Sequence, residues 1–210
     1  MFRDRIEAGI RLASRLKKFE KDDSIVLAVP RGGVPVAYAV ARELGFPVDL
    51  VLTKKIGHPA NKEYTIGAAS LTDYFVVPHE DVSQEYIKEE LAGIRERLKR
   101  MHKAFSGDHE PVSLEGKTVI VIDDGIATGN TLLGTVEILR HGKPRKIIIA
   151  VPVASRSAFQ KLSREVDEVI AVLIPESFHG VGAFYEDFTQ VSDEEVIYLL
   201  QKLKNLKKRA

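Results

Sequence analysis

Short apolar runs alternate along this chain with segments of helical periodicity, and this alternation limits the fold more than any other feature. Each run lacks the apolar–polar alternation of a half-exposed strand, so both of its faces are expected to be buried. The runs occupy residues 24–29, 48–53, 118–122, 146–151 and 168–173. Buried strands separated by helices predict an α/β fold, a mostly parallel twisted sheet flanked by helices.

Apolar stripes at helical spacing predict the helices between these strands. They are expected at residues 2–20, 34–44, 83–105 and 129–141, near 155–163, and from about 192 onward. Residues 66–70 and 74–77 are expected to form a hairpin around Thr72-Asp73. Residues 54–63 are polar and contain Gly57 and Pro59, and we expect a mobile loop there.

The length of 210 residues predicts a single domain, because it is only moderately above the usual domain size of about 150 residues. We expect residues 24–175 to form the core. Residues 1–23 together with 176–210 are expected to form a small hood and the terminal helices of the same domain. These two end segments are called the hood region below.

Composition excludes several classes of function. The chain has 31 Lys and Arg against 30 Asp and Glu, so no global basic field attracts nucleic acid. It has no Cys, which excludes disulfides, thiolate nucleophiles and zinc–thiolate sites. The longest apolar run, residues 147–154, is far shorter than the about 20 residues of a membrane span, and Asp4 and Glu7 interrupt any signal peptide. We expect a cytoplasmic protein without a membrane or nucleic-acid partner.

The most informative motif is the thirteen-residue string VIVIDDGIATGNT, residues 119–131. A buried strand ends in two adjacent carboxylates, Asp123 and Asp124, and a loop rich in Gly and Thr leads directly into a helix. Free backbone N–H groups at that helix start attract phosphate. Carboxylates beside a phosphate site suit sugar hydroxyls or a magnesium ion. Alternatively, Asp124 only caps the helix and the glycines only make the turn.

This string resembles the signature of the type I phosphoribosyltransferases, which bind 5-phosphoribosyl pyrophosphate (PRPP). The resemblance implies that Asp123 and Asp124 hold the ribose hydroxyls, and that this pair is also where Mg²⁺ belongs. It assigns the 5′-phosphate to Ala127, Thr128, Gly129, Asn130 and Thr131. Gly125 replaces the branched residue that is usual at its position.

Two further loops are similar to stretches of the same family, and the likeness extends in order over roughly residues 24–175. Arg31, Gly32 and Gly33 resemble the pyrophosphate loop of the xanthine-guanine phosphoribosyltransferases. Lys54 and Lys55 resemble the Arg-Lys stretch of the adenine enzymes and are expected to meet the leaving pyrophosphate. Taken alone, the first motif is an ordinary turn and the second a pair of solvated charges.

The hood region is expected to hold the acceptor base. Phe184 and Tyr185 are candidates to stack on the base, and Asp187 is a candidate to accept hydrogen bonds from it. The alternative is a hydrophobic hood core in which all three aromatic side chains pack inward. The 6-oxopurine enzymes have an aspartate at the position of Ala127, whereas adenine- and uracil-type members have alanine, so adenine is the first candidate base.

The sequence therefore predicts transfer of the phosphoribosyl group from magnesium-bound PRPP to a nucleobase, with release of pyrophosphate, in nucleotide salvage. The residues expected to carry the reaction are Arg31, Lys54, Lys55, Asp123 and Asp124. The alternative is a non-catalytic PRPP-binding regulator of nucleotide metabolism. A homodimer is compatible with either function.

Overall fold

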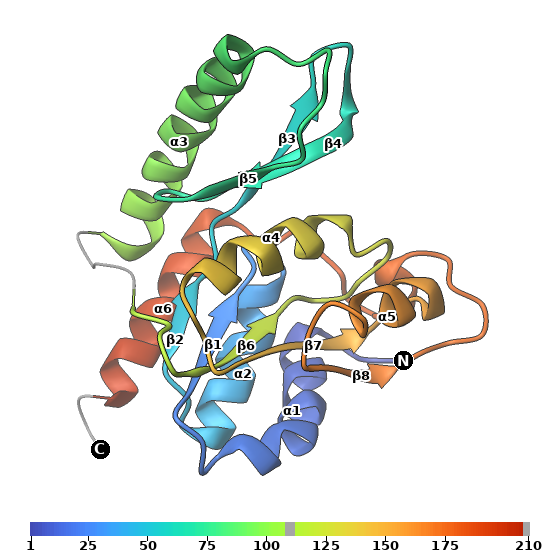
Figure 1. Cartoon of the computed structure of the whole chain (residues 1–210). Helices are drawn as coiled ribbons and strands as arrows, with labels where there is room; N and C mark the ends of the chain where they lie inside the picture. Colours follow the sequence, from blue (N-terminus) through green and yellow to red (C-terminus); the bar gives the residue numbers. More distant parts are fainter. Residues whose placement is uncertain (108–111, 208–210) are drawn as a thin grey trace.

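Five parallel strands form the central sheet, as the computed structural model shows for residues 1–107 and 112–207 (Figure 1). Their order across the sheet is β2 (Val48–Leu50), β1 (Ser24–Ala28), β6 (Thr118–Ile122), β7 (Lys146–Val153) and β8 (Glu168–Leu173). Every pairing between neighbours is parallel. The predicted sheet is confirmed, although β2 ends earlier than expected because the chain leaves the sheet after Leu50.

Helices cover both faces of this sheet (Figure 1). On one face, α1 (Arg5–Leu16), α2 (Gly33–Leu44) and α6 (Asp193–Lys207) pack against alternate strand residues such as Val26 and Ile120. On the other face, α4 (Asn130–His141) and α5 (Arg156–Leu162) pack against the intervening residues, among them Val119. A short 3-10 helix, Lys17–Phe19, follows α1. Burial on both faces explains why the strands are continuously apolar.

A separate unit, which we call the arm, projects above the sheet (Figure 1). It contains β3 (Lys54–His58), β4 (Asn61–Ala69), β5 (Tyr74–Val76) and α3 (Gln84–Ser106). The three strands form an antiparallel sheet whose apolar face packs on α3 around Ile56, Ile66 and Leu98. The predicted hairpin and long helix are confirmed here.

The expectation of a mobile loop at 54–63 is wrong, because these residues form most of the β3–β4 hairpin. Lys54 pairs with Ala69, and His58 pairs with Asn61. Most residues of 54–63 are exposed, so the apolar alternation of a strand is visible only around Ile56. Gly57 marks an irregularity in the pairing and a close approach of strands, since a Cβ there would lie 2.4 Å from the carbonyl oxygen of Lys62.

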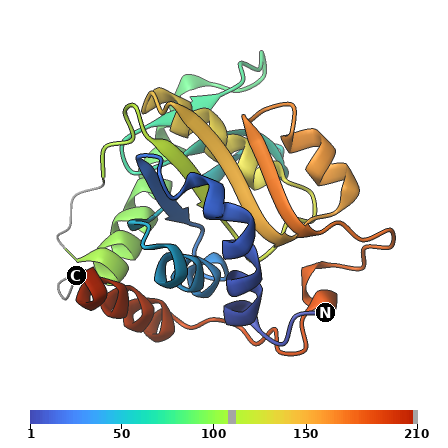
Figure 2. The ribbon, with the colours of Figure 1, turned by 90° about the horizontal axis from the view of Figure 1, so that it is seen from below.

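The two segments of the hood region, residues 1–23 and 176–210, meet beside β8 (Figure 2). Phe2 pairs with Tyr185 as an isolated parallel bridge, with its N–H donating to the Phe184 carbonyl at 2.8 Å. A short 3-10 helix, Val181–Phe184, precedes this contact. Phe2, Val153 and Tyr185 are buried together in a small apolar cluster. The N-terminus is thereby fixed close to the carboxyl ends of the strands.

Gly9 provides a test of the packing beneath the sheet. A Cβ at Gly9 would lie 2.6 Å from both the Ala39 Cβ and the Val36 carbonyl oxygen, so α1 and α2 cross with no room for a methyl group. We expect Gly9→Ala to lower the free energy of unfolding by about 1–3 kcal/mol. The control Gly93→Ala, in an open position on α3, should instead gain about 0.5–1 kcal/mol. Urea unfolding measures both, and equal stability of the two variants would contradict the crossing.

Candidate functional site

The loops after β1 and β6 touch at the carboxyl edge of the sheet. Ala28 and Ile122 are paired at the ends of these two strands. A Cβ at Gly33 would lie 2.5 Å from the Ile122 carbonyl oxygen, and one at Gly32 would lie 2.0 Å from the Asp124 carboxylate. A larger residue at either position would push the loops apart. The two strongest sequence motifs therefore form one site.

The two acids of this site are held in different ways. The Asp123 carboxylate accepts a hydrogen bond from the Asp124 backbone N–H at 2.8 Å. The Asp124 carboxylate accepts one from Arg5 Nε at 2.9 Å, and both of these side chains are largely buried. Burial and the neighbouring Asp124 raise the pKa of Asp123 to about 8. Burial also raises the pKa of Asp124, and the hydrogen bond from Arg5 opposes this effect.

The start of α4 has an uncapped N-terminus at the place where the sequence predicts a phosphate site. Gly129 is the N-cap in the left-handed conformation, with φ 74°, and no side chain caps the helix. Thr128, Asn130 and Thr131 are exposed beside it. Backbone N–H groups at such a helix start attract anions. The alternative that Asp124 merely caps this helix is wrong, because no side chain caps α4 and the Asp124 carboxylate binds Arg5 instead.

Contacts from residues that the sequence does not single out hold the segment leading to α4 in place. Ser155 Oγ donates to the Ala127 carbonyl at 2.6 Å, and Ile126 forms a parallel bridge with Ala154. Lys161 on α5 donates to the Asn130 side chain at 2.7 Å. Ser155 follows β7, so its place after a strand could have identified it. Lys161 had no such signal among many surface lysines.

A cavity of about 510 Å³ opens next to Asp124. Three of its lining residues, Arg31, Gly32 and Asp124, were predicted site residues. Arg5, Val181, Phe188, Gln190 and Val191 complete the lining. The cavity is thus lined by the loop after β6, the loop before α2 and both segments of the hood region.

The hood aromatics divide between this cavity and the interior. Tyr185 is only 6% exposed, its ring lies against Phe2 and Phe188, and its hydroxyl donates to the Asp124 carbonyl at 2.6 Å. Phe184 stacks on Phe178, with ring centroids 5.6 Å apart. Neither predicted stacking residue lines the cavity, and their placement matches the alternative of inward packing. Phe188 is the aromatic residue that lines the cavity.

The remaining predicted charges lie outside or at the edge of the cavity. Asp187 is exposed, and hydrogen bonds from Thr189 lower its pKa. Lys54 and Lys55 are exposed at the start of β3, where Lys55 pairs with Glu63 at 2.7 Å. Arg31 lines the cavity and pairs with Asp193 of α6. Only Arg31 of these residues therefore reaches the cavity in this conformation.

The acid pair is chemically suited to magnesium, because Mg²⁺ takes oxygen ligands and is usually held by one or two carboxylates together with substrate phosphates. Within residues 1–107 and 112–207, no group of three or more acidic, His or Cys side chains is placed to hold a metal by itself. The carboxyl oxygens of Asp123 and Asp124 are the type of ligand that magnesium takes, and the remaining ligands would be oxygens of water or phosphate.

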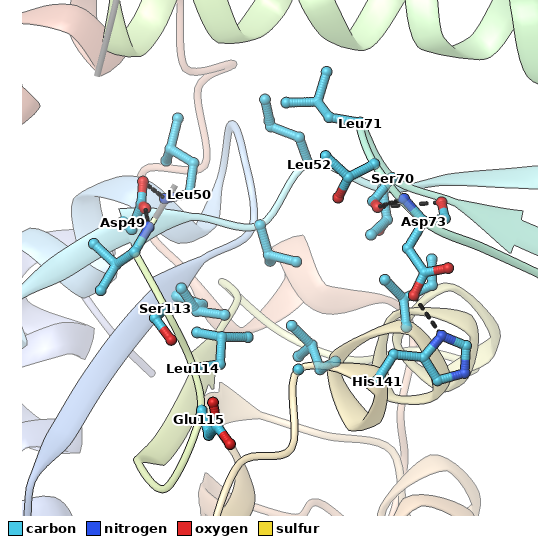
Figure 3. A pocket seen from close by; sticks show the side chains of 18 of the residues that line it. Asp49, Leu50, Leu52, Ser70, Leu71, Asp73, Ser113, Leu114, Glu115 and His141 are labelled. Carbon is cyan, nitrogen blue, oxygen red and sulfur yellow. Dashed lines mark hydrogen bonds and ion pairs between the residues drawn. The ribbon is translucent and has the colours of Figure 1, made fainter. Parts of the chain in front are cut away.

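A second cavity of about 570 Å³ lies between the sheet edge, the end of α4 and the arm (Figure 3). Leucine side chains such as Leu52, Leu71 and Leu114 make much of its wall. The Asp73 carboxylate at its rim contacts His141, the last residue of α4. This cavity is therefore at the opposite end of α4 from the acid pair.

Comparison with known proteins agrees with the geometry. Residues 4–189 match the family model of the phosphoribosyl transferase domain. The solved structure of TT1426 from Thermus thermophilus is 36% identical, covers 97% of this chain and 99% of its own, and has a TM-score of 0.88. A Mycobacterium tuberculosis protein provisionally named a phosphoribosyl transferase is 33% identical over 96% of this chain and 47% of its own length. The ribose-phosphate pyrophosphokinase of Pyrococcus furiosus is 26% identical over 67% of this chain and 59% of its own.

The chain belongs to the phosphoribosyl transferase domain family, and the predicted type I phosphoribosyltransferase resemblance and fold are confirmed. It spans about half the length of the Mycobacterium tuberculosis relative. Across the part of the chain that the structure describes, no helix is long and apolar enough to cross a membrane.

The raised pKa of Asp123 predicts how stability depends on pH. An unfolded Asp titrates near pH 4, whereas Asp123 titrates at about 8 in the fold. Between these values the folded state holds the extra proton, so the free energy of unfolding falls as pH rises, by at most about 1.4 kcal/mol per pH unit. Asp123→Asn should remove this pH-dependent fall in the free energy of unfolding.

Urea unfolding at pH 5 and pH 8, with a chelator present, measures the effect. The control is Glu89→Gln, which changes an exposed carboxyl on α3. We expect the control to lose as much stability as the parent between the two pH values, and Asp123→Asn to lose less. The same loss in all three proteins would contradict the protonated state of Asp123.

Proposed function

We propose that this protein transfers the 5-phosphoribosyl group of magnesium-bound PRPP to a ring nitrogen of a base and releases pyrophosphate. The observation that carries the proposal is the direct contact between the Gly32-Gly33 loop and the Asp123-Asp124 pair. That contact places a diphosphate-compatible loop beside groups suited to sugar hydroxyls. The uncapped start of α4 follows the acid pair within the same loop and would take the 5′-phosphate.

Each part of the site has a role in the proposed reaction. Asp123 and Asp124 accept hydrogen bonds from the ribose hydroxyls, and residues Ala127 to Thr131 bind the 5′-phosphate. Arg31 donates to the pyrophosphate, while the backbone of Gly32 and Gly33 allows its close approach. Asp123 and Asp124 would hold the magnesium ion that arrives with PRPP, and this ion would offset negative charge on the leaving pyrophosphate. The bond from ribose C1 to the pyrophosphate oxygen breaks, and its electron pair leaves with that oxygen. A ring nitrogen of the base supplies the electron pair of the new bond to C1, and the proton released from that nitrogen passes to water.

In the proposed reaction, Lys54 and Lys55 bind the leaving pyrophosphate. Both lie on the arm and outside the cavity, so this role requires the β3–β4 hairpin to move toward Asp124. Positive charge arriving near the pyrophosphate stabilises the negative charge that develops there as the bond breaks.

The acceptor would occupy the part of the cavity that the hood region lines. PRPP would bind beside it, against the loops of the core formed by residues 24–175. Phe188, Gln190 and Val181 offer an aromatic edge, an amide and an apolar wall. Adenine is the first candidate, because Ala127 supplies no carboxylate for a 6-oxopurine. The process served would be nucleotide salvage in the cytoplasm.

A non-catalytic PRPP-binding regulator is the second candidate function. It is favoured by the position of Lys54 and Lys55, which leaves the cavity without the two cations assigned to the leaving group. Such a protein would bind PRPP tightly and turn nothing over.

An assay of pyrophosphate release tests the proposal. The parent is given magnesium, PRPP and, in separate reactions, adenine, guanine, hypoxanthine, xanthine or uracil, and we expect adenine to be used best. Asp123→Asn with Asp124→Asn should abolish turnover and weaken PRPP binding in calorimetric titration, because a hydrogen bond to the charged Asp124 carboxylate contributes about 1.5–3 kcal/mol. Unchanged PRPP affinity in the double variant would contradict the assignment of the acids. Tight PRPP binding by the parent without turnover of any base would favour the regulator.

The lysine assignment is tested separately with a ligand that lacks pyrophosphate. Lys54→Ala and Lys55→Ala should each lower the rate of pyrophosphate release strongly while leaving the affinity for ribose 5-phosphate nearly unchanged. Lys88→Ala, which removes an exposed charge from α3 of the same arm, is the control and should change neither quantity. Equal losses of rate and of ribose 5-phosphate affinity would indicate a structural role for the lysines.

A further inference from the structure

Arg5 contacts two parts of the molecule that are far from it in the sequence, the loop after β6 and residues 188–189. Its Nε donates to the Asp124 carboxylate at 2.9 Å, and its Nη1 donates to the Thr189 carbonyl at 2.8 Å. Its guanidinium carbon lies 3.9 Å from the centroid of the Phe188 ring. The Arg5 side chain is 11% exposed, so its ion pair with Asp124 is largely withdrawn from solvent.

The Asp124 carboxylate is confined by these contacts. Arg5 binds its Oδ2 atom, and the Cα of Gly32 lies so close that a Cβ there would be 2.0 Å from the same oxygen. The Tyr185 hydroxyl holds the Asp124 main-chain carbonyl at 2.6 Å. Backbone and side chain of Asp124 are thus both fixed, and Arg5 supplies the only ion pair found for this carboxylate among the described residues.

We infer that Arg5 is a positioning residue, which holds the Asp124 carboxylate in the orientation that binds the ribose and ties that orientation to the hood region. This inference rests on the proposed function, because it assumes that Asp124 meets the sugar. Arg5 donates to Asp124 while its flat face lies on Phe188, a residue of the acceptor cavity. A change in the hood region on acceptor binding would therefore reach the sugar site through one side chain.

The chemistry of the position favours arginine. A guanidinium offers a planar fork of donors and an apolar face at the same time, whereas a lysine ammonium is a point charge that cannot make this set of contacts. Its positive charge also opposes the effect of burial, which raises the pKa of both Asp123 and Asp124. By comparison, Arg11 of the same helix forms a more exposed pair with Glu7.

A double-mutant cycle tests the inference by calorimetric titration of magnesium and PRPP into the parent, Arg5→Gln, Asp124→Asn and the double variant. We expect Arg5→Gln to weaken PRPP binding by roughly ten- to a hundredfold, the range for a hydrogen bond to a charged group. In the Asp124→Asn background the same change should have little further effect, because Arg5 acts through Asp124. Arg5→Lys keeps the charge and should recover part of the affinity.

Arg11→Gln is the matched control, since it removes an ion pair from the same helix away from the site, and its PRPP affinity should equal that of the parent. Circular dichroism and thermal unfolding confirm that each variant is folded. Parent-like affinity in folded Arg5→Gln, or losses that simply add in the double variant, would overturn the role of Arg5 and leave the proposed function intact. Failure of the parent to bind PRPP would overturn both.

Discussion

The parallel pairing of β1 with β6 is the constraint on which the rest of the site depends. It brings the ends of two strands from distant parts of the chain to the same level, so Ala28 faces Ile122. The loops that follow can then touch only because Gly32 and Gly33 have no side chains. Buried apolar residues on both faces of the sheet hold this register, and a shift of it would separate the two loops.

The contact creates an electrostatic cost that the hood region offsets. Two neighbouring carboxylates are partly withdrawn from water, which raises the pKa of Asp123 to about 8. Arg5 brings one positive charge to Asp124 from the start of α1, and Tyr185 donates to the same residue's main chain. The two segments of the hood region therefore stabilise the Asp123-Asp124 loop and also line the cavity beside Asp124.

The sheet, the helices and the acid–glycine site were predictable because their signals are local: apolar runs, helical stripes and a loop that leads directly into a helix. The hairpin at 54–63 was missed, since its exposed polar residues and Gly57 are also typical of a loop. Arg5 was missed because nothing in its neighbourhood marks it, and it meets Asp124 only through the fold. Choosing Phe188 over Tyr185 for the cavity likewise required the packing of the hood region.

The most direct test of the account is where a sugar phosphate binds. Ribose 5-phosphate titrated into isotope-labelled protein, followed by amide chemical shifts, reports the site without requiring turnover or an acceptor. The account predicts that the largest shifts occur at the backbone amides of Asp124 and of residues 128–131. Shifts gathered instead around the second cavity, near Leu71 and His141, with residues 128–131 unmoved, would contradict it.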